Sequence, residues 1–237
     1  MKVKFLYITL AFLLFTNFYA NAQVWNLRLG IGLMSYNGDL VTSVISLPNA
    51  HAAIRLGFGV EVYPRLGVEI SYLRGNVSSK NVENIDPAKF VNFSSPIDNY
   101  SLLIKYRLDK MNIHSSRFGL SLLLGGGIFM FDPIENVNGT QVILSENQRE
   151  GVAYSLQENE FNLGLEFSYM ITRKWVISLQ SIYHFTSTDY LDDVSIRKNP
   201  KNNDAYMDNT ISAIYRFGSE KAFKRLQDPM KCPAFLK

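Results

Sequence analysis

Three neighbouring side chains are of the types that carry out nucleophilic catalysis. His184, Ser187 and Asp189 would supply a base, a hydroxyl nucleophile and an orienting acid, the set that hydrolases and acyltransferases bring into contact. The segment around His184 alternates in polarity like a strand, in which every second residue shares a face. His184 would therefore share its face with Thr186 and not with Ser187. We interpret His184 as a hydrogen-bonded polar side chain, and we expect the protein not to be an enzyme and to need no cofactor.

The same stretch carries three carboxylates within five residues, at Asp189, Asp192 and Asp193. Oxygen ligands at close spacing could bind calcium, but the regular alternate positions and the glycine of an EF-hand are missing. Asp side chains in loops commonly hydrogen-bond the local backbone and stabilise turns. The pattern therefore favours an acidic loop and predicts no metal site.

The chain that must position these residues has 237 residues, of which 47% are hydrophobic and 19% charged. Its 29 Phe and Tyr residues are too many for a disordered chain. A single Cys excludes a disulfide framework within the chain, and the formal charge of +3 argues against a nucleic-acid partner. The mean hydropathy of -0.02 excludes a bundle of membrane helices, which needs several apolar runs of about 20 residues.

Residues 1–22 are predicted to be a secretory signal peptide. Two lysines precede an apolar run at 5–15, and Ala20-Asn21-Ala22 places small residues at the cleavage positions. The apolar run is too short to span a membrane. We expect the mature chain to begin at Gln23 and to carry a formal charge of +1, because the removed segment contains two lysines and no acid.

Beyond the signal peptide, the chain alternates between apolar and polar residues in eight segments. Leu27, Leu29 and Ile31, for example, alternate with Arg28 and Gly30, and this period of two predicts strands. At about 9 to 13 residues each, the strands are long enough to cross a bilayer at a tilt. They are expected near residues 25–33, 54–62, 66–72, 100–107, 118–130, 161–171, 175–184 and 210–217.

The connections between these segments alternate strictly between short and long. Short connections are predicted at 63–65, 111–116 and 172–174, and long ones near 37–51, 75–97, 132–160 and 186–206. Even-stranded outer-membrane barrels have this asymmetry, with short periplasmic turns and long outer loops. The sequence therefore predicts an all-β protein over residues 23–217, an eight-stranded antiparallel transmembrane β-barrel of the outer membrane with both termini in the periplasm.

The two faces of the strands fit this interpretation, with outer-membrane lipids as the surroundings of the apolar face. A soluble sandwich would show the same alternation, but strand length, loop asymmetry and aromatic residues near the strand ends favour the barrel. The interior of an eight-stranded barrel is just filled by side chains, so a wide pore is not expected. The predicted polar network of the lumen comprises Arg28, Arg55, Glu61, Glu69, Lys105, Arg107, Glu166, His184 and Arg216.

Three segments carry a family resemblance: YNGDL at 36–40, GGGIFMFDP at 125–133 and FTSTDYLDDVS at 185–195. In this order, and with a tail ending near Cys232, the mature chain resembles the PorG-like outer-membrane β-barrel family of Bacteroidota, which is associated with type IX protein secretion. The resemblance implies a scaffold or docking subunit that contacts a periplasmic ring made of a lipoprotein and its partner protein. The most specific part of the motif is Thr188, Asp189, Tyr190, Leu191, Asp192 and Asp193.

Residues 218–237 are expected to form a periplasmic C-terminal tail, with a short amphipathic helix that ends at Asp228-Pro229. A solvated tail without a partner is the alternative. Basic side chains of this segment, Lys224 and Arg225 among them, could meet an acidic partner. Cys232 is an odd cysteine in an oxidising compartment, so a disulfide with a partner or a second copy is a hypothesis for it.

Two other functions remain open from the sequence. One is a stand-alone structural or adhesive barrel like the small OmpA-type domain, with recognition through the outer loops. The other is a lipid-modifying outer-membrane enzyme that uses His184. Scaffolding in a secretion machine is the function that the sequence favours.

Overall fold

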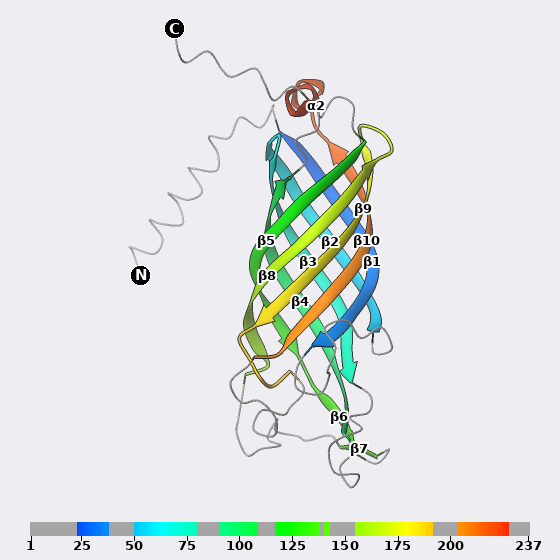
Figure 1. Ribbon diagram of the computed structural model, residues 1–237, viewed down its shortest axis with the longest axis vertical. Coiled ribbons are helices and arrows are strands. Elements are labelled where there is room, and N and C mark those ends of the chain that lie inside the picture. The colour runs from blue at the N-terminus through cyan, green and yellow to red at the C-terminus, as the bar shows by residue number, and fades with distance from the viewer. Residues whose placement is uncertain are drawn as a thin grey trace, which may run out of the picture.

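A computed structural model describes residues 23–37, 50–79, 91–108, 117–137, 140–142, 155–191 and 203–227. It is an antiparallel sheet that closes on itself, as predicted (Figure 1), because the first strand, β1, pairs with the last, β10, and β3 pairs with β4 to complete the ring. A hairpin of β6 (Ile134–Val137) and β7 (Thr140–Val142) extends from β4 beyond the barrel. The eight barrel strands are β1 (Val24–Asn37), β2 (Ala50–Tyr63), β3 (Leu66–Ser79), β4 (Val91–Arg107), β5 (Phe118–Phe131), β8 (Gln157–Met170), β9 (Trp175–Thr186) and β10 (Ala205–Phe217).

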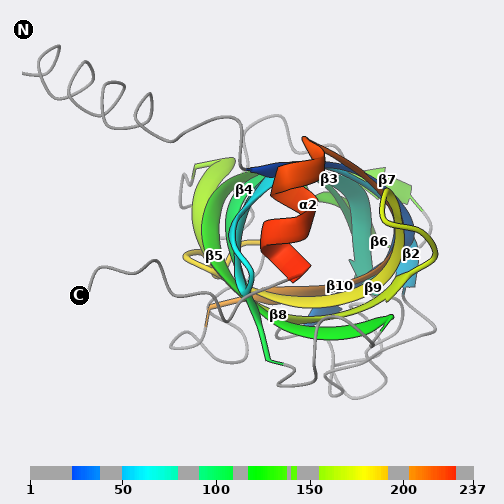
Figure 2. The same ribbon diagram turned by 90° about the horizontal axis from the view of Figure 1, so that it is seen from above.

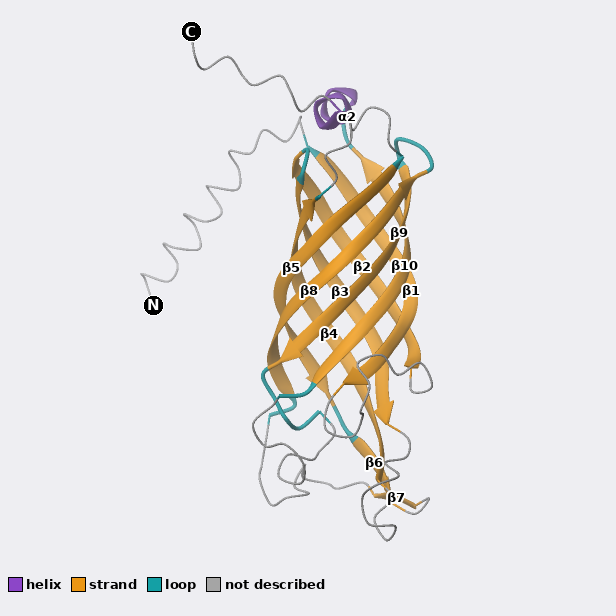
Figure 3. Ribbon diagram, in the orientation of Figure 1, coloured by secondary structure: helices purple, strands orange, loops and turns teal. Residues whose placement is uncertain are grey.

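The two ends of the barrel differ in their connections. At one end, here called the turn end, lie the connections 64–65 and 171–174, together with the end of β4, the start of β5, the start of β1 and the end of β10. Helix α2 (Glu220–Gln227) lies across this end, as Figure 2 shows. At the opposite end, here called the loop end, lie the strand ends that flank the four longer connections (Figure 3). The predicted alternation of short and long connections is therefore present.

The predicted long connection at 75–97 is wrong in extent, because most of it is strand. β3 and β4 stay paired from Gly75 opposite Ile97 to Ser79 opposite Phe93. The polarity reverses in this extension: Val77 and Phe93 point into the barrel and are buried, whereas the alternating pattern in the middle of the barrel has its apolar residues outside. A barrel that projects beyond the lipid can have a polar outside and an apolar inside. The sequence prediction assumed an apolar outer face along each whole strand, and it therefore missed this extension.

The outer surface of the middle of the barrel is apolar and fully accessible. Ile31, Ile70 and Ile211 are 69%, 63% and 60% exposed, and neighbouring strands present similar residues. An exposed apolar surface of this extent is typical of contact with lipid or another protein. No helix in the described ranges is long and apolar enough to cross a membrane.

Aromatic side chains gather at both ends of this apolar band. At the turn end, Trp25 stacks on Phe58 with ring centroids 5.4 Å apart. At the loop end, Tyr72 lies 5.0 Å from Tyr100. Two aromatic belts that border an apolar band are the mark of the two membrane interfaces of a transmembrane barrel.

Inside the barrel, the side chains form two chemically different layers. Polar and charged side chains fill the middle, and glycine provides room for them: a Cβ on Gly57 would lie 2.7 Å from Oε1 of Glu69 and 3.2 Å from Cβ of Arg28. An apolar cluster, here called the apolar plug, fills the loop end. It consists of Met34, Tyr36, Ala53, Leu73, Val77, Phe93, Ile97, Phe129, Phe131, Leu191 and Tyr206.

Candidate functional site

The first group of charges in the lumen is centred on Arg28 and is called here the Arg28 cluster. The Arg28 guanidinium lies 2.9 Å from Oε1 of Glu69 and 2.6 Å from Oε2 of Glu166, and it donates to Oγ of Ser178 at 2.7 Å. Lys105 forms an ion pair with the other oxygen of Glu166. Because these residues come from β1, β3, β4, β8 and β9, the cluster crosses the lumen and fills its section.

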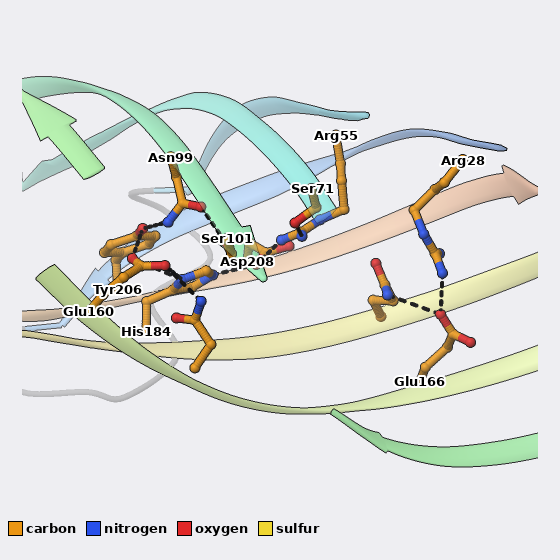
Figure 4. A network of polar contacts seen from close by, with 12 residues as sticks. Arg28, Arg55, Ser71, Asn99, Ser101, Glu160, Glu166, His184, Tyr206 and Asp208 are labelled. Carbon is orange, nitrogen blue, oxygen red and sulfur yellow. Dashed lines mark hydrogen bonds and ion pairs between the residues drawn. The ribbon is translucent and has the colours of Figure 1, made fainter. Parts of the chain in front are cut away.

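The second group lies closer to the loop end and is called here the His184 cluster (Figure 4). Nε2 of His184 lies 2.7 Å from Oδ2 of Asp208, and Nδ1 lies 3.1 Å from Oε1 of Glu160. Arg55 also contacts Oδ2 of Asp208 at 2.7 Å. Tyr206 stacks on the His184 ring at 4.3 Å and donates to Oε2 of Glu160 at 2.5 Å. The cluster is almost entirely shielded from solvent.

Within each cluster, positively and negatively charged side chains are paired. Each carboxylate faces at least one cationic donor, and His184, hydrogen-bonded to carboxylates on both sides, fits the form with a hydrogen on each ring nitrogen. Buried ion pairs need such pairing, since an isolated buried charge is strongly unfavourable. With His184 in that form, four cations meet four carboxylates: Arg28, Arg55, Lys105 and His184 against Glu69, Glu160, Glu166 and Asp208.

The structure does not bring the catalytic-type residues together. Oγ of Ser187 donates to Oε2 of Glu158 at 2.8 Å, on the exposed side of the strand end, whereas both nitrogens of His184 contact carboxylates inside the barrel. The inward residue after His184 is Thr186, whose hydroxyl donates to the carbonyl oxygens of Asp204 and Thr188. The His184 imidazole is therefore bonded to Glu160 and Asp208, and Ser187 lies on the other face of the strand end.

Residues 188–191, the described part of the family motif, cover the loop end of the lumen. Leu191 is fully buried in the apolar plug, and its backbone N–H donates to Oδ2 of Asp204 at 3.0 Å. Oδ1 of the same Asp204 accepts from the Tyr36 hydroxyl at 2.7 Å. The Thr188 hydroxyl accepts from the Tyr190 N–H. The described part of the motif is therefore a folded cover of the lumen, and Asp192 and Asp193 lie outside the described residues.

At the turn end, the remaining predicted lumen residues form a looser group. Arg216 makes a 2.7 Å ion pair with Glu61 and lies 5.7 Å from the ring centroid of Phe223 in α2. Phe223 and Ala222 pack on Val24 at the start of β1, so α2 is anchored to the barrel. Arg107 donates to the carbonyl of Phe118 at 3.4 Å.

All nine residues of the predicted polar network lie on the inner face of the strands, in the Arg28 cluster, in the His184 cluster or at the turn end. Lys224 and Arg225 lie within α2, and Cys232 lies outside the described residues. Sequence reasoning missed Glu160, Asp208 and Tyr206, because it began the strands at Phe161 and Thr210. Continuing the same alternation back from Glu166 and from Arg216 would have found these residues.

The acidic side chains of the lumen do not form a metal site in the part of the chain that the structure describes. In those ranges, no three His, Cys, Asp or Glu side chains are grouped so that they could hold a metal ion. The carboxylates of the two clusters are instead occupied by Arg, Lys, His and Tyr donors.

A closed barrel of eight antiparallel strands, with lipid-compatible side chains outside and balanced charges inside, is a transmembrane β-barrel of the outer-membrane type. The chain belongs to the family described as Domain of unknown function (DUF6089), whose model matches residues 4–224. No curated protein matches the sequence.

Solved outer-membrane structures are similar to this chain at low identity. The attachment invasion locus protein Ail of Yersinia pestis has 12% identity and a TM-score of 0.47, covering 82% of this chain and 98% of Ail. A major outer membrane protein from Thermus thermophilus has 11% identity and a TM-score of 0.49, covering 83% and 100%. OprG from Pseudomonas aeruginosa has 15% identity and a TM-score of 0.47, covering 84% and 98%.

Proposed function

We propose that this protein is a non-enzymatic scaffold, whose barrel holds a periplasmic protein assembly at the outer membrane. The observation that supports this most strongly is the filled lumen. The Arg28 cluster, the His184 cluster and the apolar plug occupy successive levels of the barrel. A lumen filled in this way fits a membrane anchor better than a channel for solutes. The resemblance to the PorG-like family suggests which assembly is held: the ring of a type IX secretion machine, made of a lipoprotein and its partner.

The proposed orientation has the turn end in the periplasm. Short turns face the periplasm in outer-membrane barrels of this kind, and the start of β1 and the end of β10 lie at the same end. α2 and the tail after it would then be presented to periplasmic partners. The basic residues Lys224 and Arg225 of α2 suggest an acidic partner surface, and Cys232 follows them in the sequence.

The non-enzymatic part of the proposal is supported by the surroundings of His184. Both of its nitrogens are engaged by carboxylates, and its side chain is 0% exposed, whereas a catalytic base must reach a substrate proton. A His184→Ala strain should therefore retain unchanged lipid A. Altered lipid A in that strain would show instead that the buried imidazole has a catalytic role.

Affinity purification tests the scaffold role. A tag inserted in the 80–90 connection leaves the turn end and the tail unobstructed, and the tagged chain is purified from native membranes in a mild detergent. We expect soluble periplasmic chains and a lipoprotein to co-purify. Lys224→Glu combined with Arg225→Glu should reduce their recovery, and Arg74→Glu at the loop end serves as the charge control.

Recovery of the barrel alone would contradict the scaffold role and favour a stand-alone structural or adhesive barrel. The disulfide hypothesis has its own test, because Cys232 is the single cysteine of the chain. On non-reducing gels of whole cells, a covalent complex should be present in wild type and lost in Cys232→Ser. Identical migration of the two would reject the disulfide and leave non-covalent docking intact.

A further inference from the structure

A group of five buried polar atoms in the lumen has no hydrogen-bond partner among the described residues. The atoms belong to residues of β2, β9 and β10 that are at most 2% exposed. A buried polar group left unpaired costs free energy, and most buried polar groups in folded proteins have a partner in the protein or in ordered water. The five atoms are Nε of Arg55, Oε1 of Gln180, Oδ1 of Asp208, Oγ1 of Thr210 and Oγ of Ser212.

These atoms lie along strands that connect the two charged clusters. Asp208, Thr210 and Ser212 are successive inward residues of β10, and Asp208 is part of the His184 cluster. Gln180 of β9 lies opposite Thr210 and donates to Oε2 of Glu166 in the Arg28 cluster at 2.9 Å. Successive inward residues of a strand are about 7 Å apart, which is comparable to the span of two hydrogen bonds that meet at one water molecule. A single small molecule can therefore bridge neighbouring groups on this path.

The inward residues around these atoms are small. They are Gly30, Ser71, Ser101, Ser178 and Ser212, from five different strands. Gly30 lies opposite Ser212 on one side and opposite Arg55 on the other, and a Cβ at Gly30 would collide with Oγ of Ser212. The Ser212 hydroxyl therefore lies over the bare backbone of β1, toward Arg55. Because the interior of an eight-stranded barrel is just filled by ordinary side chains, a part lined by glycine and serine leaves space for small molecules.

The chemistry of the five atoms favours water over an ion. Nε of Arg55 can only donate a hydrogen bond, Oδ1 of Asp208 and Oε1 of Gln180 can only accept one, and the hydroxyls of Thr210 and Ser212 can do both. A cation would be repelled by the guanidinium of Arg55, and an anion by the carboxylate of Asp208. A water molecule both donates and accepts, and buried water typically makes about three hydrogen bonds to polar groups that are otherwise unsatisfied.

We propose that ordered water molecules bind to these five atoms and join the Arg28 cluster and the His184 cluster into one hydrogen-bond network. A bridging water is nearly as favourable in enthalpy as a direct hydrogen bond. Arg28, which is 1% exposed, bounds this water on the turn-end side, and the apolar plug bounds it on the loop-end side. The water is therefore enclosed and exchanges slowly with the solution, which is compatible with a lumen that does not conduct. This inference does not depend on the scaffold role.

Removal of single hydroxyls distinguishes hydrated groups from dry ones, with the urea midpoint of unfolding in lipid vesicles as the measurement. Thr210→Val and Ser212→Ala should each lower the midpoint by roughly 0.3–1 M, the range of one hydrogen bond. A dry, unpaired hydroxyl predicts the opposite, because its removal relieves an unfavourable burial. Ser95→Ala is the matched control: Oγ of Ser95 is also buried and unpaired in the described part of the chain, but its inward neighbours in β4 are Phe93 and Ile97 of the apolar plug. Its midpoint should not fall.

Oxygen-17 relaxation dispersion of water, recorded on the full chain in nanodiscs, detects long-lived bound water without interference from exchanging hydroxyl protons. We expect a dispersion in wild type, a loss of about one water molecule or more when Thr210→Val and Ser212→Ala are combined, and no loss in Ser95→Ala. If the combined variant does not fold, each single variant gives the same comparison. The proposal is overturned if the dispersion equals that of wild type, whatever the midpoints show, and equally if neither midpoint falls.

Discussion

Nη2 of Arg28 lies 2.6 Å from Oε2 of Glu166, and the two side chains are 1% and 0% exposed although 138 residues separate them in sequence. They come from β1 and β8, which are not neighbours, because β10 and β9 lie between them in the sheet. The same guanidinium contacts Glu69 on β3, in the other direction around the barrel. Arg28 is thus a bridge across the lumen, and its removal should affect the whole barrel.

Arg28→Ala should destabilise the barrel by about 3–5 kcal/mol, because it leaves Glu69 and Glu166 with less compensation inside the lumen. Arg74→Ala is the matched control: its ion pair with Asp98 is 3.5 Å long and the Arg side chain is 68% exposed, so little or no change in stability is expected, since exposed ion pairs contribute little. The measurement is the urea midpoint of unfolding in lipid vesicles. Equal midpoints for the two variants would mean that the buried cluster contributes no more than a surface pair.

Gly57→Ala should also be destabilising, by about 1–3 kcal/mol, the usual effect of overpacking. Its new methyl group would lie 2.7 Å from Oε1 of Glu69 and displace the carboxylate that Arg28 holds. Gly67→Ala adds the same methyl group at a position where the nearest atom is 3.4 Å away, and its stability should stay within about 0.5 kcal/mol of wild type. If both variants unfold at the same urea concentration as wild type, the Glu69 carboxylate can move away from the added methyl group without loss of stability, contrary to this account.

Leu191→Ala tests whether the family-motif segment is part of the barrel core. Because Leu191 is 0% exposed within the apolar plug, truncation should cost about 2–5 kcal/mol and make the 187–204 connection more sensitive to protease. Leu156→Ala, at a 37% exposed loop-end leucine, should have a much smaller effect on both. A Leu191→Ala protein as stable and protease-resistant as wild type would show that the cover does not contribute to the fold.

Much of the fold was predictable from the sequence, because one signal repeats along each strand. Residues such as Leu27, Leu29 and Ile31 face lipid while Arg28 faces the lumen, and this contrast defines both the strand and its faces. The signal fails at the loop end, where Val77 and Phe93 are apolar and inward. Once the surroundings change from lipid to water, the polarity of the outer face changes with them.

The site was predictable only in part. The parity of each strand places Arg28, Glu166 and His184 inside, but partner choice depends on how strands far apart in sequence are staggered. The pairing of His184 with Asp208 and Glu160 follows from the register of β9 between β8 and β10, which the alternation alone does not fix. The stack of Tyr206 on His184 is likewise a consequence of register.

The central claim is that the barrel anchors and does not conduct, and ion flux across proteoliposomes tests it most directly. The full chain is reconstituted, its insertion is verified by the heat-dependent gel shift of the recovered protein, and release of trapped potassium is followed. A closed lumen predicts release no faster than from protein-free vesicles, with a general porin as the positive control. Rapid release through verified wild-type barrels would contradict the closed lumen and with it the scaffold role.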